Sequence, residues 1–362
     1  MFSLLFLVSR WPGRDGGAVW KADFMTYRIA INGYGRIGRC VLRALYESDR
    51  HDDFAVVGLN ELSHIEAIAH LTRFDSTHGR FQGRVSHDGQ TLFVDDQAIS
   101  VFTEPDPDRL PWAELGVDVV MECSGRGDFM RVAEGHLQSG ARKVLFSCPA
   151  GTAVDATVVY GINHQVLTAA HRIISNASCT SNCITPVIAV LDRHFEIQHG
   201  MITTIHSIMN DQPVIDAYHN RDLRKSRSSS QSVIPVDTAL PSGIDRLLPH
   251  LAGCFQAVAL RVPITNVSVM QLTAQVKIPT EARQVNEVLQ AAAAEGLAGI
   301  LGYSELPLVS CDFIHDSRSA VVDASQTRVC GHTGVSVLAW FDNEWGYANR
   351  MLDTARVLLT AA

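Results

Sequence analysis

A glycine-rich turn between two apolar segments constrains this chain more than any other feature. Residues 33–38 have the spacing GxGxxG, and the apolar run 27–32 precedes them. Apolar residues then recur at helical spacing up to Leu45, and a second apolar run follows at 54–59. A strand, a helix and a second strand over this length predict a βαβ unit with parallel strands and a right-handed crossover.

The three glycines of this turn have different physical roles. Gly33 permits the tight turn, Gly35 lets the backbone approach a pyrophosphate, and Gly38 lets the helix pack closely on the strand. The N-terminus of the helix then faces the phosphates with its partial positive charge. We expect the whole turn to contact a dinucleotide: Gly33, Tyr34, Gly35, Arg36, Ile37 and Gly38.

The identity of the dinucleotide depends on the acid that follows the second strand. Glu61 stands 23 residues after Gly38. A carboxylate there can accept hydrogen bonds from both adenosine ribose hydroxyls and would repel a 2′-phosphate, which favours NAD over NADP. A glycine-rich turn without a ligand fits this context poorly. FAD shares the fingerprint, so the turn alone does not define hydride chemistry.

The rest of the pattern predicts an α/β fold with an N-terminal Rossmann dinucleotide-binding domain. Further strands are expected at 117–121 and 143–146, with a helix near 131–137 between them. Beyond residue 178 the pattern becomes β-rich with partial alternation, which predicts an α+β domain with a mixed or antiparallel sheet. Its expected strands are 200–208, 255–262 and 267–276, and its expected helices are 281–294 and 340–354.

Composition excludes several classes of function. The chain has 30 Lys and Arg against 38 Asp and Glu, a net charge of −8, which disfavours nucleic-acid binding. No apolar run approaches the ~18 residues of a membrane span. The eight cysteines are scattered without a CxxC pair, as in a reduced, cytoplasmic protein. Residues 1–24 lack the basic start and cleavage site of a signal peptide, so we expect a disordered tail or a start codon placed upstream of the true one.

A cysteine at the start of a helix is the candidate nucleophile. Ser178 is a good N-cap, so Cys179 is expected in the first helical turn, where the helix dipole lowers the pKa of a thiol below about 8.5. Pro186 disfavours one continuous straight helix, so we expect the first turn to be offset from the rest. His206 lies towards the end of the predicted strand 200–208 and is the candidate base. Cys183 is interpreted as a buried structural thiol, and no metal site is expected because no further ligand stands at metal-binding spacing.

Five runs give the chain a clear resemblance to the glyceraldehyde-3-phosphate dehydrogenase superfamily, from about Thr26 to Thr354. They are INGYGRIGR, FDSTHGR (74–80), SNASCTSNC, RVPITNVSV (261–269) and WFDNEWGYANRM (340–351). The resemblance implies an NAD-binding domain at 25–178, a catalytic domain at 179–342, and a C-terminal helix (343–362) that returns to the first domain. It also implies a homotetramer that acts on a small aldose phosphate.

The resemblance also implies roles for individual residues. Cys179 matches the nucleophile and His206 the base. The other matches are Ser124 and Asn343 as cofactor contacts, with Asn343 on the nicotinamide carboxamide, Arg227 and Arg261 on anionic groups, and Ser178, Thr180 and Thr238 around a second anion site.

Two departures from the family pattern concern the substrate. Met209 stands where the family has a threonine that binds the substrate phosphate, and Ala239 stands where a glycine is usual. These two residues and the runs 230–237 and 306–313 resemble the erythrose-4-phosphate dehydrogenase branch of the superfamily more than its other members. That branch oxidises D-erythrose 4-phosphate to 4-phosphoerythronate, toward pyridoxal phosphate, through a cysteine thiohemiacetal and a thioester resolved by water.

Two alternatives stay open at this stage. One is a phosphorylating glyceraldehyde-3-phosphate dehydrogenase, because Arg227, Thr180 and Thr238 could keep a phosphate site. The other is a nucleotide- or RNA-binding protein that has lost catalysis. The intact Cys179 and His206 and the acidic net charge argue against this second alternative.

Overall fold

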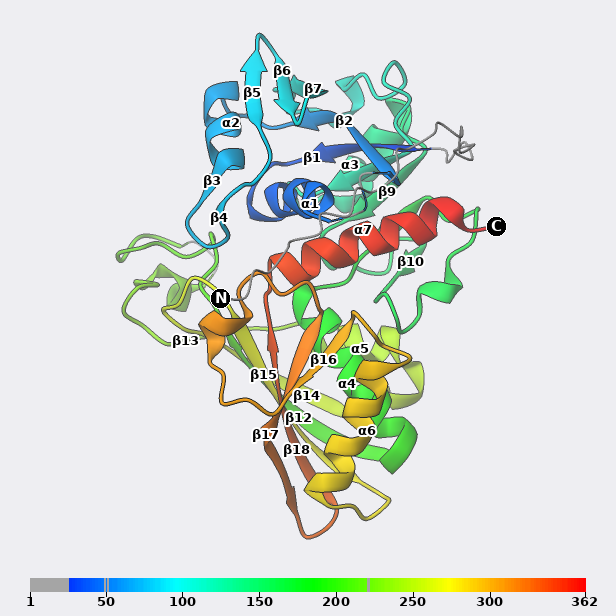
Figure 1. Cartoon of the computed structure of the whole chain (residues 1–362), viewed down its shortest axis with the longest axis vertical. Helices are drawn as coiled ribbons and strands as arrows, with labels where there is room; N and C mark the ends of the chain where they lie inside the picture. The colour runs from blue at the N-terminus through cyan, green and yellow to red at the C-terminus, as the bar shows by residue number, and fades with distance from the viewer. Residues whose placement is uncertain (1–25, 49, 51, 220–221) are drawn as a thin grey trace, which may run out of the picture.

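The computed structural model describes residues 26–48, 50, 52–219 and 222–362. In that part of the chain two large sheets, each with its own helices, lie one above the other in Figure 1. The predicted α/β fold class is confirmed by this arrangement. The expectation for residues 1–24 lies outside the described residues.

The first sheet, counted over the described residues, has nine strands in the order β10-β11-β9-β8-β1-β2-β7-β6-β5. The strands from β10 to β7 are parallel, and β6 and β5 extend the sheet as an antiparallel hairpin. Their bounds are β1 Tyr27–Asn32, β2 Phe54–Asn60, β5 Val85–Asp88, β6 Thr91–Val94, β7 Gln97–Phe102, β8 Val119–Glu122, β9 Lys143–Phe146, β10 Ala156–Thr157 and β11 Ile173–Ser175. A separate short ribbon pairs β3 (Phe74–Asp75) with β4 (Gly79–Arg80).

The order of these strands places a crevice beside β1. From β1 the chain passes through helix α1 (Arg36–Tyr46) to β2 on one side, while β8 pairs with β1 on the other side. Ligands of such sheets bind at the carboxyl ends of the strands where the order reverses. Helix α3 (Phe129–Gln138) confirms the helix expected near 131–137, and α2 (Ile65–Arg73) is a further helix that was not predicted.

The second sheet has seven strands, again within the described residues, in the order β13-β14-β12-β15-β18-β17-β16. Two of its pairs, β12–β14 and β16–β17, are parallel and the others are antiparallel, as the predicted mixed sheet requires. The bounds are β12 Ile197–His206, β13 Ile234–Val236, β14 Phe255–Arg261, β15 Ser268–Val276, β16 Leu301–Ser304, β17 Ala320–Cys330 and β18 Gly334–Phe341.

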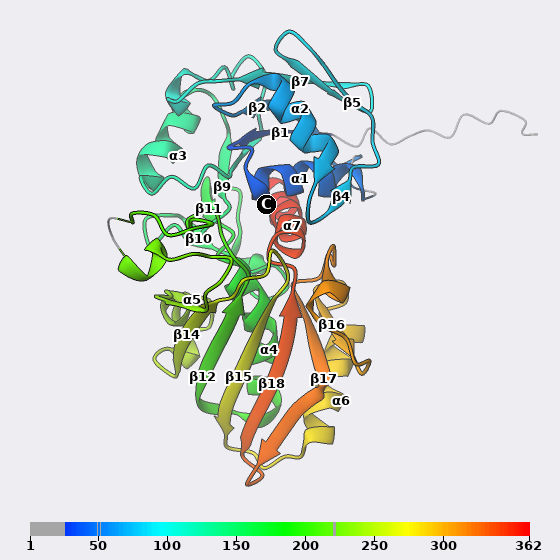
Figure 2. The same cartoon turned by 90° about the vertical axis from the view of Figure 1, so that its left-hand side faces the viewer.

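Three helices pack on one face of this second sheet: α4 (Cys179–Phe195), α5 (Leu240–Leu247) and α6 (Ala282–Ala294). Figure 2 shows β14, β12, β15, β18 and β17 side by side. Helix α4 runs from Cys179 to Phe195 with Pro186 inside it. A proline removes a single backbone hydrogen bond, and the buried apolar side chains of α4, which lie in the core with Val187, Ile188 and Leu191, keep the helix in place.

The last helix, α7 (Trp345–Thr360), leaves the second sheet and packs beside α1 of the first domain (Figure 1). The expected helical start at Trp340 is wrong, because Trp340 pairs with Val269 and Val321 as part of β18. The carboxylate of Asp342 accepts hydrogen bonds from the backbone N–H groups of Glu344 and Trp345, at 3.0 and 2.8 Å. An acceptor at this point ends the strand and begins the helix. In the described part of the chain, no helix has both the length and the apolar character needed to cross a bilayer.

Candidate active site

A cavity of about 560 Å³ lies between the two sheets and brings together residues from distant parts of the sequence. The glycine turn contributes Gly35, Arg36 and Ile37, and Ser124 follows β8. Ser178 precedes α4, and Cys179, His206 and Met209 come from the second domain. Asn343 and Tyr347 come from the C-terminal segment. The predicted nucleophile, base and carboxamide contact therefore share one cavity with the predicted dinucleotide turn.

Cys179 is the first residue of α4, as predicted. The Oγ of Ser178 accepts a hydrogen bond from the N–H of Ser181 at 3.0 Å and caps the helix. Ala177 just before it has φ of 54°, a left-handed conformation that costs about 1 kcal/mol or more in a residue with a Cβ. This bend turns the chain sharply into α4 and presents Cys179 at the cavity.

Helix α7 supports the bend from the opposite side. The Tyr347 hydroxyl donates to the carbonyl of Ala177 at 2.9 Å, and the Thr354 hydroxyl donates to Oδ1 of Asn176 at 2.7 Å. Both contacts are buried. The position of the nucleophile therefore depends on a helix more than 160 residues later in the chain.

His206 ends β12 and faces the thiol. Its Nε2 lies 3.6 Å from the Sγ of Cys179, and its Nδ1 lies 2.8 Å from the carbonyl oxygen of Ser207. A carbonyl can only accept, so Nδ1 carries the proton in the neutral ring and Nε2 is left as an acceptor. The imidazole is thus oriented to take a proton from the thiol.

The two groups are neutral as they stand. Burial raises the pKa of the Cys179 thiol to about 11, although the Arg261 charge and the backbone N–H groups of Thr180 and Cys179 act to lower it. Burial and then the Arg261 charge lower the pKa of His206 to about 4. The prediction of a lowered thiol pKa is wrong in net direction, because loss of water around the thiolate outweighs the helix dipole. Attack by this thiol would therefore require loss of its proton, and Nε2 of His206 lies 3.6 Å away as an acceptor.

Arg261, which ends β14, is the predicted anion ligand that lies near this pair. The pKa values of both Cys179 and His206 respond to its charge. Its Nη1 is buried and has no hydrogen-bond partner among the described residues. A buried guanidinium donor without a partner is costly, and an anionic substrate group would satisfy it.

The glycine turn fits a dinucleotide. A Cβ on Gly33, where φ is +84°, would lie 2.4 Å from the backbone of Ser124, and one on Gly38 would lie 2.2 Å from the carbonyl oxygen of Gly33. Both positions therefore exclude a side chain. Gly35 instead faces open space, and no side chain caps the N-terminus of α1. These features leave a cradle of backbone N–H groups of the kind that binds a pyrophosphate.

A second cavity, of about 290 Å³, continues from this cradle along the carboxyl ends of β1 and β2. Glu61 lines it, with Gly33, Gly35, Ser124 and Arg126. The Glu61 carboxylate accepts hydrogen bonds from the N–H of Tyr34 at 2.7 Å and of Leu62 at 2.8 Å. These two backbone N–H groups hold the Glu61 carboxylate at the position where an adenosine ribose would bind. The side chain of Tyr34 is buried, with its hydroxyl 2.9 Å from that of Thr72, so any contact of Tyr34 with a dinucleotide would be through its backbone.

A third cavity, of about 180 Å³, opens on the other side of Ser178. The three predicted hydroxyl residues Ser178, Thr180 and Thr238 line it together. Its walls also include Arg246 of α5 and Asp237. The structure does not bring Arg227 here or to the main cavity, because its exposed guanidinium pairs with Asp216 at 2.9 Å. Arg246 is thus the cation that the geometry places beside these hydroxyls.

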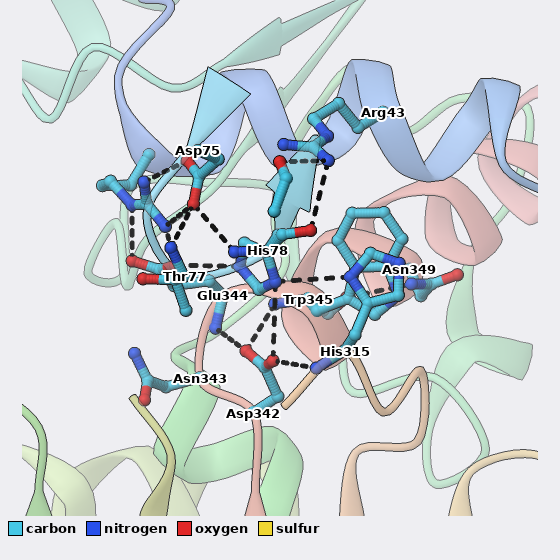
Figure 3. Close-up of polar contacts among 12 residues, drawn as sticks. Arg43, Asp75, Thr77, His78, His315, Asp342, Asn343, Glu344, Trp345 and Asn349 are labelled. Atoms are coloured by element: carbon cyan, nitrogen blue, oxygen red, sulfur yellow. Dashed lines mark hydrogen bonds and ion pairs between the residues drawn. The ribbon is translucent and has the colours of Figure 1, made fainter. Parts of the chain in front are cut away.

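A polar cluster under the main cavity joins the glycine turn to the start of α7. The Arg36 guanidinium binds the carboxylates of Asp75 and Glu344, and the Nε2 of His78 lies 3.0 Å from Glu344. Figure 3 shows His78 between the side chains of Glu344 and Asp342, with Asn343 apart from this cluster. The hydrogen bonds from Arg36 and His78 hold the pKa of Glu344 below its usual value despite burial.

The same cluster brings Cys40, His78 and Glu344 within reach of one ion. The bidentate ion pair with Arg36 already satisfies Glu344, so the cluster is complete without a metal.

Several residues of these sites are not evident from the sequence alone. Tyr347 and Glu344 lie in the run 340–351, yet their roles depend on contacts across the domains. Arg246 is one charged residue on an amphipathic helix, and nothing in its local sequence separates it from a solvent-exposed side chain. Cys183 is buried, as predicted, and all eight cysteines are free thiols.

The strand order, the glycine cradle and the shared cavity define a two-domain dehydrogenase that uses a nicotinamide dinucleotide. Residues 27–128 match the family model described as glyceraldehyde 3-phosphate dehydrogenase, NAD binding domain, and residues 178–343 match the one described as glyceraldehyde 3-phosphate dehydrogenase, C-terminal domain. The chain therefore belongs to the glyceraldehyde-3-phosphate dehydrogenase superfamily, and its cofactor is NAD.

Proposed function

We propose that this enzyme oxidises D-erythrose 4-phosphate to 4-phosphoerythronate with NAD, a reaction that leads toward pyridoxal phosphate. The Cys179–His206 pair at 3.6 Å, in one cavity with Arg36 and Asn343, carries the aldehyde chemistry. Met209 supports the choice of substrate. Its half-exposed thioether lines that cavity and offers no donor to a phosphate, so a phosphate must bind elsewhere than in the usual family pattern.

In the proposed reaction, His206 moves protons while Cys179 bonds to the substrate. His206 Nε2 accepts the thiol proton while Cys179 Sγ attacks the aldehyde carbon and forms a thiohemiacetal. The imidazolium and the first N–H groups of α4 face the oxygen that gains negative charge. NAD, when bound, supplies the hydride acceptor for the oxidation. Asn343 and Ser124 would hold its nicotinamide end, and Glu61 its adenosine ribose.

The product of oxidation is a thioester on Cys179. The imidazolium of His206 first releases the former thiol proton to solvent. The neutral Nε2 then takes a proton from a water molecule as that water attacks the acyl carbon. The Cys179 sulfur leaves as a thiolate and regains a proton from the imidazolium. The product leaves as a carboxylic acid that loses its proton to solvent, and the Cys179–His206 pair is neutral again.

The third cavity supports a second candidate, phosphorolysis by inorganic phosphate. Ser178, Thr180 and Thr238 supply hydroxyl donors beside the nucleophile, and Arg246 supplies a positive charge. Asp237 lines the same small cavity, and its negative charge opposes an anion. We therefore favour hydrolysis and keep the phosphorylating glyceraldehyde-3-phosphate reaction as the alternative.

We also propose that the enzyme works as a cytoplasmic homotetramer. Large apolar side chains gather on the loop that links β12 to β13 and are strongly exposed: Val214, Ile215, Tyr218, Leu223 and Val233. Such a concentration on one segment is typical of an interface between protein chains. Sedimentation equilibrium of the full chain tests this point, and a monomer at micromolar concentration would contradict it.

Initial rates of NADH formation test the proposed function. We expect turnover of D-erythrose 4-phosphate without inorganic phosphate, and loss of nearly all turnover in Cys179→Ser while NAD still binds. A rate that depends on inorganic phosphate with glyceraldehyde 3-phosphate would support the phosphorylating alternative instead. No turnover of either aldose phosphate would indicate a nucleotide-binding protein without catalysis.

A further inference from the structure

Ser207, the residue after the proposed base, contacts both halves of the reaction centre. Its side chain is fully buried. Its carbonyl lies 2.8 Å from Nδ1 of His206, and its hydroxyl donates to Oδ1 of Asn343 at 3.0 Å. One residue therefore touches the group that moves the proton and the amide that is proposed to hold the nicotinamide.

A second buried serine completes this arrangement. Ser268, at the start of β15, accepts a hydrogen bond from the N–H of Ser207 at 3.0 Å and donates to Oδ1 of Asn343 at 2.8 Å. Because its oxygen already accepts from Ser207, its single proton needs an acceptor, and Oδ1 provides one. Two hydroxyl donors on Oδ1 fix the orientation of the amide.

This orientation leaves the other end of the amide as the functional end. With Oδ1 held by two serines from the second domain, the Nδ2 group of Asn343 remains as a donor at the cavity that Asn343 lines. A donor in that position matches the carbonyl oxygen of a carboxamide. A flipped amide would present an acceptor there and would repel the same oxygen.

We propose that Ser207 and Ser268 are positioning residues for the cofactor. Their hydroxyls hold the Asn343 amide with its NH₂ group toward the nicotinamide carboxamide. The Ser207 carbonyl meanwhile holds His206 in the tautomer whose Nε2 faces Cys179. The inference rests on the proposed binding of the nicotinamide at Asn343. Ser207 would then position both the proton acceptor His206 and the cofactor.

The backbone and side-chain parts of this role are separable by mutation. Ser207→Ala removes the hydroxyl and keeps the carbonyl, so it should loosen Asn343 without changing the tautomer of His206. One lost hydrogen bond corresponds to about 5-fold weaker NAD binding, and loss of both hydroxyls in Ser207→Ala/Ser268→Ala to roughly 10- to 50-fold. The pH profile of kcat/KM should stay in place in Ser207→Ala.

Ser319→Ala is a matched control. Ser319 is also a buried serine of the second domain, but its hydroxyl has no hydrogen-bond partner among the described residues. Ser319→Ala also removes one buried hydroxyl oxygen, but it leaves the hydrogen bonds of Asn343 unchanged. We expect NAD binding in Ser319→Ala to equal that of the unmodified enzyme.

Isothermal titration calorimetry with NAD and with ADP-ribose tests the inference on the full-length enzyme. ADP-ribose keeps the adenosine and both phosphates but lacks the nicotinamide, so the serine variants should bind it normally while NAD binding weakens. Equal weakening for both ligands would show general damage to the cleft and would overturn the inference. A shifted pH profile in Ser207→Ala would also overturn it, because the hydroxyl would then act on His206.

A parallel titration of Asn343→Ala separates this inference from the proposed function. If Asn343→Ala weakens NAD binding and the serine variants do not, the serines have no positioning role and the inference is wrong. If Asn343→Ala also binds NAD normally, the proposed seat of the nicotinamide is itself wrong.

Discussion

Glu344→Gln is the substitution that most directly tests how the two domains are held around the cavity. The Glu344 carboxylate accepts from Nε of Arg36 at 2.8 Å and from a second guanidinium nitrogen, and it lies 3.0 Å from Nε2 of His78. Side-chain exposure is 12% for Glu344, 24% for Arg36 and zero for His78. Removal of one partner from a buried ion pair costs about 3–5 kcal/mol of unfolding free energy.

The matched control is an ion pair of the same kind on the surface. Arg84 contacts Asp96, and their side chains are 77% and 80% exposed. Solvent screens such a pair, so Asp96→Asn should change the free energy of unfolding by less than about 1 kcal/mol. Both variants replace one carboxylate by its amide, and they differ in burial and in the domains that the pair connects.

Urea unfolding at pH 7, followed by tryptophan fluorescence, measures the difference. Glu344→Gln should shift the midpoint to clearly lower urea, and Asp96→Asn should leave it nearly unchanged. Equal midpoints for the two variants would refute the argument that this buried cluster holds the domains together.

Acid provides an independent check of the same carboxylate. The pKa of Glu344 lies below its usual value of 4.5, so its charge stabilises the fold above that pH, and this contribution is lost as pH falls through the lowered pKa. The difference in unfolding free energy between the unmodified enzyme and Glu344→Gln should therefore have its full value at pH 7 and decrease below about pH 4.5. A gap that stays constant down to pH 3 would contradict an electrostatic origin.

Two further predictions concern the reaction centre. The pKa of His206 is lowered from 6.5 to about 4, so protonation favours the unfolded chain, and the enzyme should lose about 3 kcal/mol of unfolding free energy as pH falls from 6.5 to 4. Unfolding free energies measured against pH should show this loss reduced in His206→Asn, and parallel curves would contradict it. Met209→Thr adds a hydroxyl donor to the cavity, and a charge-assisted hydrogen bond of about 1.5–3 kcal/mol should lower the KM for glyceraldehyde 3-phosphate roughly 10- to 100-fold. The KM for unphosphorylated glyceraldehyde should not change, and an equal effect on both substrates would show that Met209 does not face the phosphate.

The local features of the fold were predictable because each depends on neighbouring residues. The βαβ unit with its glycine turn, the cap at Ser178 and the mixed second sheet all follow from spacing and periodicity. The start of α7 was misplaced because Trp340 continues the apolar pattern of Trp345, and only the Asp342 carboxylate separates strand from helix. The continuity of α4 through Pro186 depends on packing partners that a local pattern does not contain.

The candidate site was predictable in its chemistry and less so in its contacts. Cys179, His206 and Asn343 do share one cavity. The environment of that cavity could not be deduced, because the net shift in the pKa of Cys179 depends on how far the fold removes water from the thiol. The contrast between Arg227 and Arg246 has a similar origin. Both are single cations beside polar residues, and only tertiary placement shows that Arg246 reaches the hydroxyl-lined cavity while Arg227 pairs with Asp216.

The return of α7 to the first domain affects the order in which the chain can mature. Its side chains Tyr347, Met351, Leu352 and Leu358 belong to the same apolar core as Ile29, Val41 and Leu59. While α7 is still inside the ribosome, that core lacks the side chains of α7, and the bend before Cys179 lacks its hydrogen bonds from Tyr347 and Thr354. The dinucleotide-binding half, although synthesised first, can therefore reach its final form only after α7 has left the ribosome.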